Sequence, residues 1–114
     1  MLNDLKAIED LKEHPTRPGF YQLPRYPLLY INKEQVIVDS REDIELMPYV
    51  GYYDYLKVDV TGLAGGILVH RAMAETFLDP GGQEPRSYQV NHKDGNKLNN
   101  ALKNLEFVTR AQNS

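Results

Sequence analysis

The C-terminal part of the chain, residues 89–113, reads QVNHKDGNKLNNALKNLEFVTRAQN. Residues 88–90 and 105–108 are short runs rich in apolar side chains, which predict two strands. Between them, residues 93–104 are dense in asparagine, lysine and glycine and predict a long turn-forming loop. Thr109 is a suitable N-cap for a closing helix. This stretch therefore predicts a strand, loop, strand and helix, a ββα unit at about residues 86–114.

The segments upstream of this unit predict a small antiparallel sheet followed by one helix. Residues 28–31 and 35–38 predict a first hairpin, and residues 52–60 with 67–69 predict a second one through the glycine-rich turn at 62–66. The period then changes, because His70, Met73, Ala74 and Phe77 recur at helical spacing until the Asp-Pro-Gly-Gly run at 79–82. The acidic segment 41–45 is expected to be a solvated loop.

The first 27 residues are expected to form an appendage to a domain that spans residues 28–114. Apolar residues recur at a spacing of three in the first part of it: Leu2, Leu5, Ile8 and Leu11. This spacing predicts a short amphipathic helix that docks on the domain, with self-association through the same helix as the alternative. Residues 15–27 contain four prolines, and this density predicts a linker.

Composition describes one globular unit and excludes several classes of protein. The chain has 114 residues, of which 41% are hydrophobic and 25% charged, and it has no cysteine. Disulfides, cysteine-bound zinc and thiol catalysis are therefore excluded. The absence of a long apolar run predicts no membrane association and a cytoplasmic location, the host cytoplasm if a phage encodes the chain.

Charge is distributed unevenly along the chain. The formal net charge is −3, which argues against a protein that coats nucleic acid non-specifically. However, residues 86–114 contain five basic residues and two acidic ones. An anion is therefore expected to bind this C-terminal quarter.

Residues 89–113 resemble the HNH endonucleases of phages and introns, whose motif runs strand, histidine, asparagine-rich loop, Asn-Leu-Glu, strand and helix. The segment ILVHRAMAETFL at 67–78 is similar to the same family's Val-His-Arg helix entry. The resemblance implies an α+β fold with a C-terminal ββα-metal motif. It also implies hydrolysis of DNA phosphodiester bonds to 5′-phosphate and 3′-hydroxyl ends, with double-stranded DNA as the partner.

The resemblance implies roles for individual residues, which their chemistry supports. His92 matches the general base, and an imidazole is largely neutral at physiological pH and able to accept a proton. It is expected on the surface at a strand end. Asn104 matches the central asparagine, whose two amide groups can fix the loop and thereby orient the imidazole. Asn91 and Asn113 match the ligands of one divalent metal, Mg²⁺ or Mn²⁺, for which amide oxygens are suitable donors.

Several neighbouring residues have plainer interpretations. Many relatives have an aspartate where this chain has Asn91, so the protein part of the metal site is expected to be uncharged. Asp94 is interpreted as a turn residue, because Asp-Gly is a common turn pair. His70 is interpreted as a structural histidine with satisfied hydrogen bonds. Four basic residues are candidate phosphate contacts: Lys93, Lys97, Lys103 and Arg110.

Two functions remain open from the sequence. The leading hypothesis is a metal-dependent endonuclease that nicks or cleaves DNA. The alternative is a non-catalytic module with the HNH fold that binds nucleic acid or protein, which the acidic overall charge and Asn91 favour.

Overall fold

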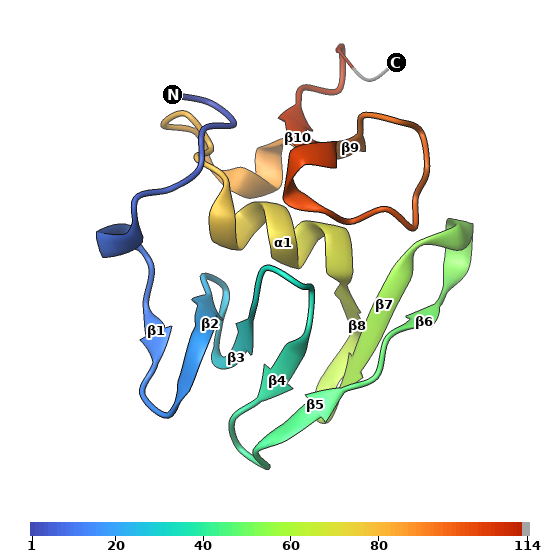
Figure 1. Cartoon of the computed structure of the whole chain (residues 1–114). Coiled ribbons are helices and arrows are strands. Elements are labelled where there is room, and N and C mark those ends of the chain that lie inside the picture. The colour runs from blue at the N-terminus through green and yellow to red at the C-terminus, as the bar shows by residue number, and fades with distance from the viewer. Residues whose placement is uncertain (113–114) are drawn as a thin grey trace.

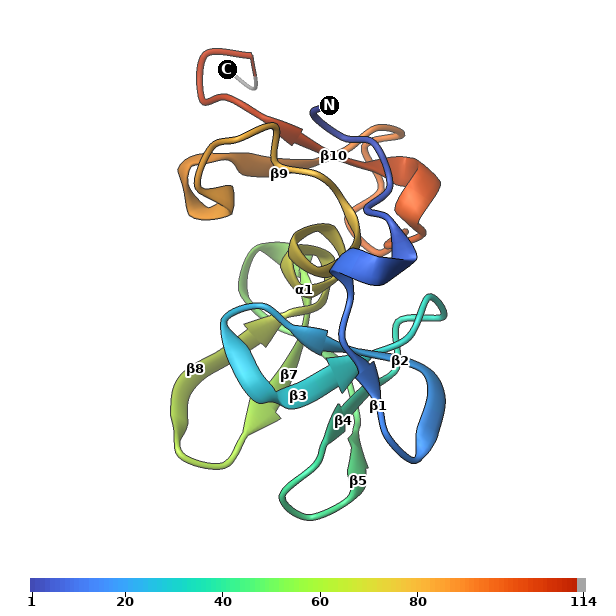
Figure 2. The same cartoon turned by 90° about the vertical axis from the view of Figure 1, so that its left-hand side faces the viewer.

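The computed structural model describes residues 1–112 and places one helix between strands on two sides (Figure 1). Helix α1 (Val69–Phe77) crosses the middle of the molecule, with a hairpin of two strands above it and two antiparallel sheets below it. Figure 2 shows the same layers with α1 seen along its axis. This arrangement confirms the α+β fold class and the small antiparallel sheet predicted from the sequence.

The two lower sheets are built from the first eight strands in chain order. The five-stranded sheet consists of β1 (Glu13–His14), β2 (Arg17–Leu23), β3 (Tyr26–Ile31), β4 (Ile37–Asp39) and β5 (Ile44–Leu46). The three-stranded sheet consists of β6 (Tyr49–Val50), β7 (Leu56–Val60) and β8 (Leu63–Leu68). Pairing of β3 with β4 and of β7 with β8 confirms the two hairpins predicted from the sequence.

The upper layer is a hairpin of β9 (Gln89–His92) and β10 (Leu105–Val108). Short 3₁₀ turns connect the larger elements: η1 (Ile8–Asp10), η2 (Tyr52–Asp54), η3 (Pro85–Ser87) and η4 (Leu102–Asn104). Because α1 has strands on both sides, eight of its nine residues are buried, and Arg71 is the exception. The helix is therefore the centre of the hydrophobic core.

The prediction of an N-terminal amphipathic helix is wrong. Residues 1–12 contain the single 3₁₀ turn η1, and Leu5 and Ile8 are 61% and 63% exposed. Backbone hydrogen bonds to the end of α1 replace helical ones, from Asn3 to Asp79 and from Lys6 to Phe77, each 2.8 Å. The segment docks on the domain as an extended strand-like stretch, and the helix on which self-association was predicted does not form.

The prediction of a proline-rich linker is also wrong, because residues 17–23 and 26–31 form β2 and β3 of the five-stranded sheet. Prolines are tolerated here because the pairing is interrupted where they lie. In the β1–β2 pair the register shifts between Glu13 and His14. In the β2–β3 pair it shifts between Gln22 and Leu23. A proline at such an irregularity removes no ladder hydrogen bond. The predicted boundary at residues 27 and 28 falls inside β3.

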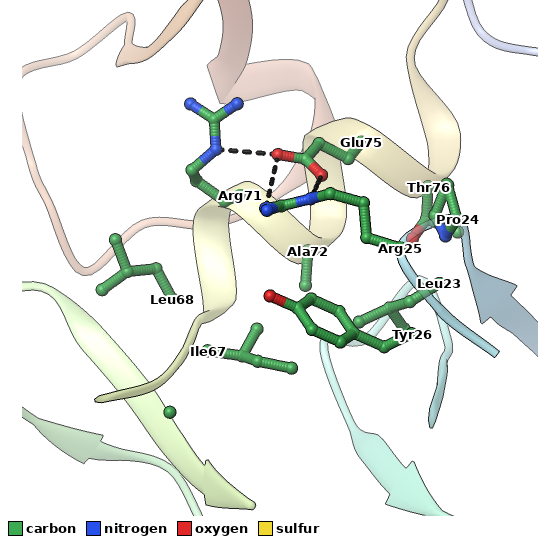
Figure 3. A pocket seen from close by; sticks show the side chains of 11 residues that line it. Leu23, Pro24, Arg25, Tyr26, Ile67, Leu68, Arg71, Ala72, Glu75 and Thr76 are labelled. Atoms are coloured by element: carbon green, nitrogen blue, oxygen red, sulfur yellow. Dashed lines mark hydrogen bonds and ion pairs between the residues drawn. The ribbon is translucent and has the colours of Figure 1, made fainter. Parts of the chain in front are cut away.

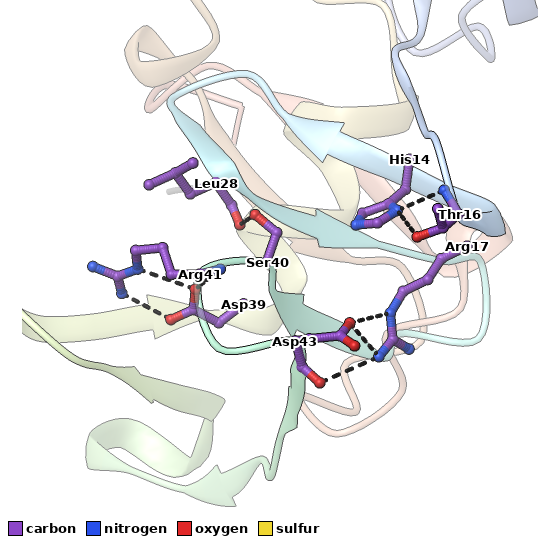
Figure 4. Close-up of polar contacts among 8 residues, drawn as sticks. All are labelled: His14, Thr16, Arg17, Leu28, Asp39, Ser40, Arg41 and Asp43. Atoms are coloured by element: carbon purple, nitrogen blue, oxygen red, sulfur yellow. Dashed lines mark hydrogen bonds and ion pairs between the residues drawn. The ribbon is translucent and has the colours of Figure 1, made fainter.

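Arg41 connects the two lower sheets, and Figure 4 shows its ion pair with Asp39. Its guanidinium donates to the buried carboxylate of Asp39 at 2.8 Å and to the carbonyl oxygen of Thr61, between β7 and β8, at 3.0 Å. The hydrogen bonds from Arg41 lower the pKa of Asp39. The segment predicted as a solvated loop is therefore partly structural, and it also contributes strand β5.

The closing helix predicted from Thr109 is not formed within the described residues. Residues 110–112 form a turn in which the Gln112 N–H donates to the Thr109 hydroxyl at 3.1 Å. The Thr109 N–H donates in return to Gln112 Oε1 at 2.8 Å. This reciprocal pair is the capping box that begins many helices. No helix among residues 1–112 is long and apolar enough to cross a membrane.

Candidate active site

The β9–β10 hairpin sets the direction of each side chain in the candidate site. His92 pairs with Leu105, and Val90 pairs with Phe107, so these four side chains share the face that packs on α1. All four are buried. His92 is 7% exposed, so the expectation that it lies on the surface is wrong. Successive side chains of a strand point to opposite faces, so His92 points inward where the half-buried Asn91 points outward.

One hydrogen bond fixes the imidazole of His92. Its Nε2 lies 2.7 Å from Oδ1 of Asn100, which is 1% exposed. With the Asn100 amide oriented so that its oxygen faces the ring, Nε2 carries the hydrogen and Nδ1 retains the lone pair, while Nδ2 of Asn100 is buried without a partner among the described residues. No described residue forms a hydrogen bond with Nδ1 of His92. The geometry therefore leaves Nδ1 as the nitrogen that can accept a proton.

Two further rings hold His92 from the side of α1. The His70 ring lies 5.0 Å from the His92 ring and 4.6 Å from the Tyr55 ring, measured between centroids. Tyr55 and His92 are 6.0 Å apart with their planes inclined by 22°. Such contacts restrict rotation of the imidazole as well as burying it. We call Tyr55, His70 and His92 the ring cluster.

His70 is buried in an uncharged state. Burial is the main cause that lowers its pKa from 6.5 to about 3, and the neighbouring His92 and Arg71 add to the effect. Its Nδ1 is buried without a hydrogen-bond partner among the described residues. His70 is thus structural, as predicted, but the prediction that its hydrogen bonds are satisfied is wrong for Nδ1.

Asn104 closes the loop at residues 93–104 with both of its amide groups. Its Oδ1 accepts from the backbone N–H of Asp94 at 3.0 Å. Its Nδ2 donates to the Asp94 carboxylate at 2.9 Å and to the carbonyl oxygen of Asn99 at 2.8 Å. These are the bonds across the loop that the sequence predicted for this residue. Since Asn100 follows Asn99 directly, Asn104 also fixes the residue that holds His92.

Asp94 has a structural position in the same loop. Its carboxylate accepts hydrogen bonds from the Asn99 side chain at 2.9 Å and from the Asn96 N–H at 2.8 Å. Those bonds, with the one from Asn104, lower the pKa of Asp94, the bond from Asn99 having the largest effect. This geometry agrees with its interpretation as a turn residue.

Asn91 lies on the outer face of the hairpin opposite Glu106. Its Nδ2 donates to the Glu106 carboxylate at 2.9 Å, and no described residue donates to its Oδ1. A carboxylate therefore lies in contact with the Asn91 amide, at the position that the sequence predicted to be an uncharged metal ligand. These oxygen donors are of the type that Mg²⁺ and Mn²⁺ accept. Within residues 1–112, no group of three or more His, Cys, Asp or Glu residues could hold a metal by itself.

The other predicted site residues lie around the hairpin. Lys93, Lys103 and Arg110 are exposed and form no ion pair with a described residue. Lys97 is engaged, because its Nζ donates to the carbonyl oxygen of Tyr53 at 2.8 Å. Asn113, the second predicted metal ligand, lies outside the described residues.

A buried ion-pair cluster anchors the segment that leads into β9 (Figure 3). Glu75, 5% exposed, accepts from Arg25 at 2.7 Å and from Arg71 at 2.8 Å. Arg71 also donates to the carbonyl oxygens of Pro85 and Tyr88, at 3.0 and 2.9 Å. The Arg71–Glu75 pair therefore positions the strand that carries His92.

Sequence reasoning missed three residues of this site. Asn100 was attributed to turn formation alone, and nothing in the pattern distinguishes it from Asn96 or Asn99. Tyr55 comes from the distant turn before β7, and its contact with His92 depends on the fold. Glu106 could have been found, since pairing of residues 89–92 with 105–108 places it opposite Asn91.

The comparisons with known proteins agree with this geometry. A family model described as HNH endonuclease matches residues 68–114. This match confirms, for these residues, the resemblance to the HNH endonucleases noted in the sequence. The match covers α1, the β9–β10 hairpin and the loop between its strands.

Individual relatives extend the similarity over most of the chain. The H-N-H endonuclease F-TflII of Escherichia phage T5 is 30% identical over 103 residues, which are 90% of this chain and 49% of that protein. The SPbeta prophage-derived protein YosQ of Bacillus subtilis (strain 168), named with the HNH homing endonucleases, is 49% identical over 47 residues, 41% of this chain and 25% of that protein. The chain thus spans between a quarter and half of these relatives.

A solved structure has the same fold. The HNH homing endonuclease I-HmuI, described in terms of DNA binding and cleavage, matches with a TM-score of 0.67 and 26% sequence identity. The match covers 82% of this chain and 54% of that one. The likeness therefore includes strands of the two lower sheets as well as the hairpin.

The neutral burial of His70 predicts that acid destabilises the fold before the carboxylates titrate. The unfolded chain binds a proton at this residue below about pH 6.5, whereas the folded chain does so only near pH 3. Unfolding free energy should therefore fall as pH decreases from 6.5 to 4.5, by up to about 1.4 kcal/mol per pH unit. His70→Phe, which keeps a ring in place, should flatten this slope in urea denaturation. Parallel slopes for the two proteins would contradict the assignment.

Proposed function

We propose that this chain is a metal-dependent endonuclease that nicks or cleaves double-stranded DNA, with His92 as the general base. The observation that carries the proposal is the bond from Nε2 of His92 to Asn100, which leaves Nδ1 with a free lone pair. A general base needs this state together with a fixed orientation. The ring cluster and the loop closed by Asn104 supply the orientation.

The proposed reaction is attack by water on the scissile phosphorus. Nδ1 of His92 removes a proton from the water as its oxygen bonds to phosphorus. The bond from phosphorus to the 3′-oxygen breaks, and the 3′-oxygen leaves with a proton from solvent. The products are a 5′-phosphate and a 3′-hydroxyl end. Positioning a base in this way is typically worth about 10²- to 10⁴-fold in rate.

A divalent cation, Mg²⁺ or Mn²⁺, would be held by Oδ1 of Asn91 and the carboxylate of Glu106, with Asn113 as a further ligand. Its chemistry there would be to neutralise charge on the phosphate and the leaving oxygen. Asn91 and His92 occupy the last two positions of β9 and point to opposite faces. A phosphate at the end of β9 can therefore approach both Asn91 and His92. A phosphate on either face of the strand could approach only one of them.

Exposed basic side chains support a phosphate-binding role for the same region. Lys93 follows His92 directly, and Lys103 lies in the turn before β10. Each such contact neutralises a phosphate and releases a counterion, which favours binding without reading the sequence. Lys97 and Arg110 are proposed to act in the same way. Lys97 would have to exchange its bond to Tyr53 for one to phosphate.

The alternative function is a non-catalytic module that keeps the HNH fold and binds nucleic acid or protein. One observation favours it, namely that residues 1–112 hold no group of three acidic or histidine ligands. Nicking assays and DNA-binding assays on the same preparation distinguish the two functions. Binding without hydrolysis in the presence of Mg²⁺ or Mn²⁺ would select the module.

His92→Ala should abolish nicking of supercoiled plasmid, with a loss of about 10²- to 10⁴-fold in rate. Because His92 is buried, the variant should also be less stable than the parent, whereas replacing a histidine on the surface would cost little stability. Circular dichroism at the assay temperature should therefore confirm that the protein is folded. His14→Ala, at a histidine on strand β1 far from the hairpin, is the matched control and should keep full activity. Equal nicking rates for His92→Ala and the parent would exclude His92 as the base.

Variants of the Asn91–Glu106 pair should change metal affinity in opposite directions. Asn91→Asp adds a second carboxylate and should strengthen Mn²⁺ binding to the free protein, whereas Glu106→Gln removes the existing charge and should weaken it. Glu9→Gln alters an exposed carboxylate elsewhere and should have no effect. Isothermal calorimetry with and without a short duplex measures all four proteins. Identical Mn²⁺ affinities across the series, in both conditions, would show that this pair is no metal site.

A further inference from the structure

The turn between β6 and β7 presents two tyrosine rings to solvent. Tyr52 and Tyr53 are 87% and 80% exposed, whereas Tyr88 is 9% exposed. Val50, just before the turn, is also exposed, at 54%. Contiguous exposed apolar and aromatic side chains of this kind commonly mark binding surfaces. We call residues 51–55 the tyrosine turn.

The backbone of the tyrosine turn is held in an unfavourable conformation. Tyr53 and Asp54 both have left-handed φ angles, 61° and 65°. A bulky residue such as tyrosine rarely adopts this region, and such strain concentrates at functional sites. Two hydrogen bonds of 2.8 Å hold the turn, from the Gly51 N–H to the Tyr55 carbonyl oxygen and from Lys97 Nζ to the Tyr53 carbonyl oxygen. The main chain is thus fixed while the two rings remain free to make contacts.

The tyrosine turn is physically connected to His92. Lys97, from the loop between β9 and β10, also lies over the Tyr55 ring, with Nζ 4.8 Å from the centroid. Tyr55 is in turn a member of the ring cluster, 6.0 Å from His92. Figure 1 shows the β6–β7 connection next to the loop that follows β9. A partner that covers the turn would therefore also meet the lysines of this loop.

We propose that Tyr52 and Tyr53 form an aromatic contact for duplex DNA beside the candidate active site. This proposal rests on the proposed function and adds a surface to it. Apolar and aromatic side chains can enter the groove of a duplex, pack on its sugars or insert between base steps, and the exposed Lys93 and neighbouring Lys97 supply the positive charge that a polyanion requires. A second copy of the chain would instead bring these lysines near their own equivalents. The turn itself carries one exposed carboxylate, Asp54, but the three lysines around it, Lys57, Lys93 and Lys97, favour DNA as the occupant.

The test compares a double variant with a matched control in a DNA-binding assay. Tyr52→Ser with Tyr53→Asn removes both rings, and asparagine tolerates the left-handed backbone at residue 53. Ile8→Ser removes a side chain of similar exposure, 63%, from the N-terminal segment. Fluorescence anisotropy with a labelled duplex in EDTA should show affinity reduced by about 10- to 100-fold in the double variant and unchanged in the control.

Salt dependence distinguishes ring packing from phosphate contact. The double variant should keep the slope of log affinity against log salt, because tyrosines release no counterions. Lys93→Ala should reduce that slope by about one.

Each outcome decides between the proposals. If the double variant binds duplex as tightly as the parent does, the proposed DNA contact is overturned. If the double variant has in addition lost self-association in sedimentation, the turn is assigned to a second copy of the chain. If the parent binds duplex through the tyrosines but does not nick, the contact stands and hydrolysis alone fails. If the parent neither binds nor nicks duplex, both proposals fail.

Discussion

The hydrogen bond from His92 to Asn100 is the contact on which the candidate site depends. An imidazole has two nitrogens, and the partner of one determines which of them can take up a proton. Asn100 lies inside the loop, so its position depends on the bonds by which Asn104 joins Asp94 and Asn99. Asn104 shows why amides suit this loop, because its side chain donates and accepts hydrogen bonds at once. Removal of any one of these amides would loosen the next.

Burial of α1 explains why a small chain can hold this site rigidly. The helix packs on the hairpin above and the sheets below, so the same residues stabilise the fold and support His92 (Figure 1). His70 extends from the helix into the ring cluster, and Arg71 holds the segment before β9. Glu75 joins that arginine to Arg25 on the lower sheet. The N-terminal strands thereby contribute to the position of a site that lies in the last quarter of the chain.

Sequence patterns predicted elements well where local chemistry and tertiary contacts agree. The β9–β10 hairpin, α1 and the inward face of the helix follow from turn residues and periodicity. The prediction for the N-terminal segment failed because its backbone bonds to the residues at the end of α1 instead of to itself, as the bridge from Leu5 to Leu78 shows. Asn100 and Tyr55 could not be found, because their importance arises from proximity to His92 across the fold.

Nitrogen-15 NMR of the histidine side chains measures directly which nitrogen of His92 carries the hydrogen. At neutral pH we expect the hydrogen of His92 on Nε2, where it should exchange slowly with solvent. The scalar coupling across its hydrogen bond to the Asn100 amide should be lost in Asn100→Ala. Nδ1 should give the shift of an unprotonated nitrogen. A His92 ring with its hydrogen on Nδ1 would contradict the account, because the nitrogen assigned as the base would then have no lone pair to accept a proton.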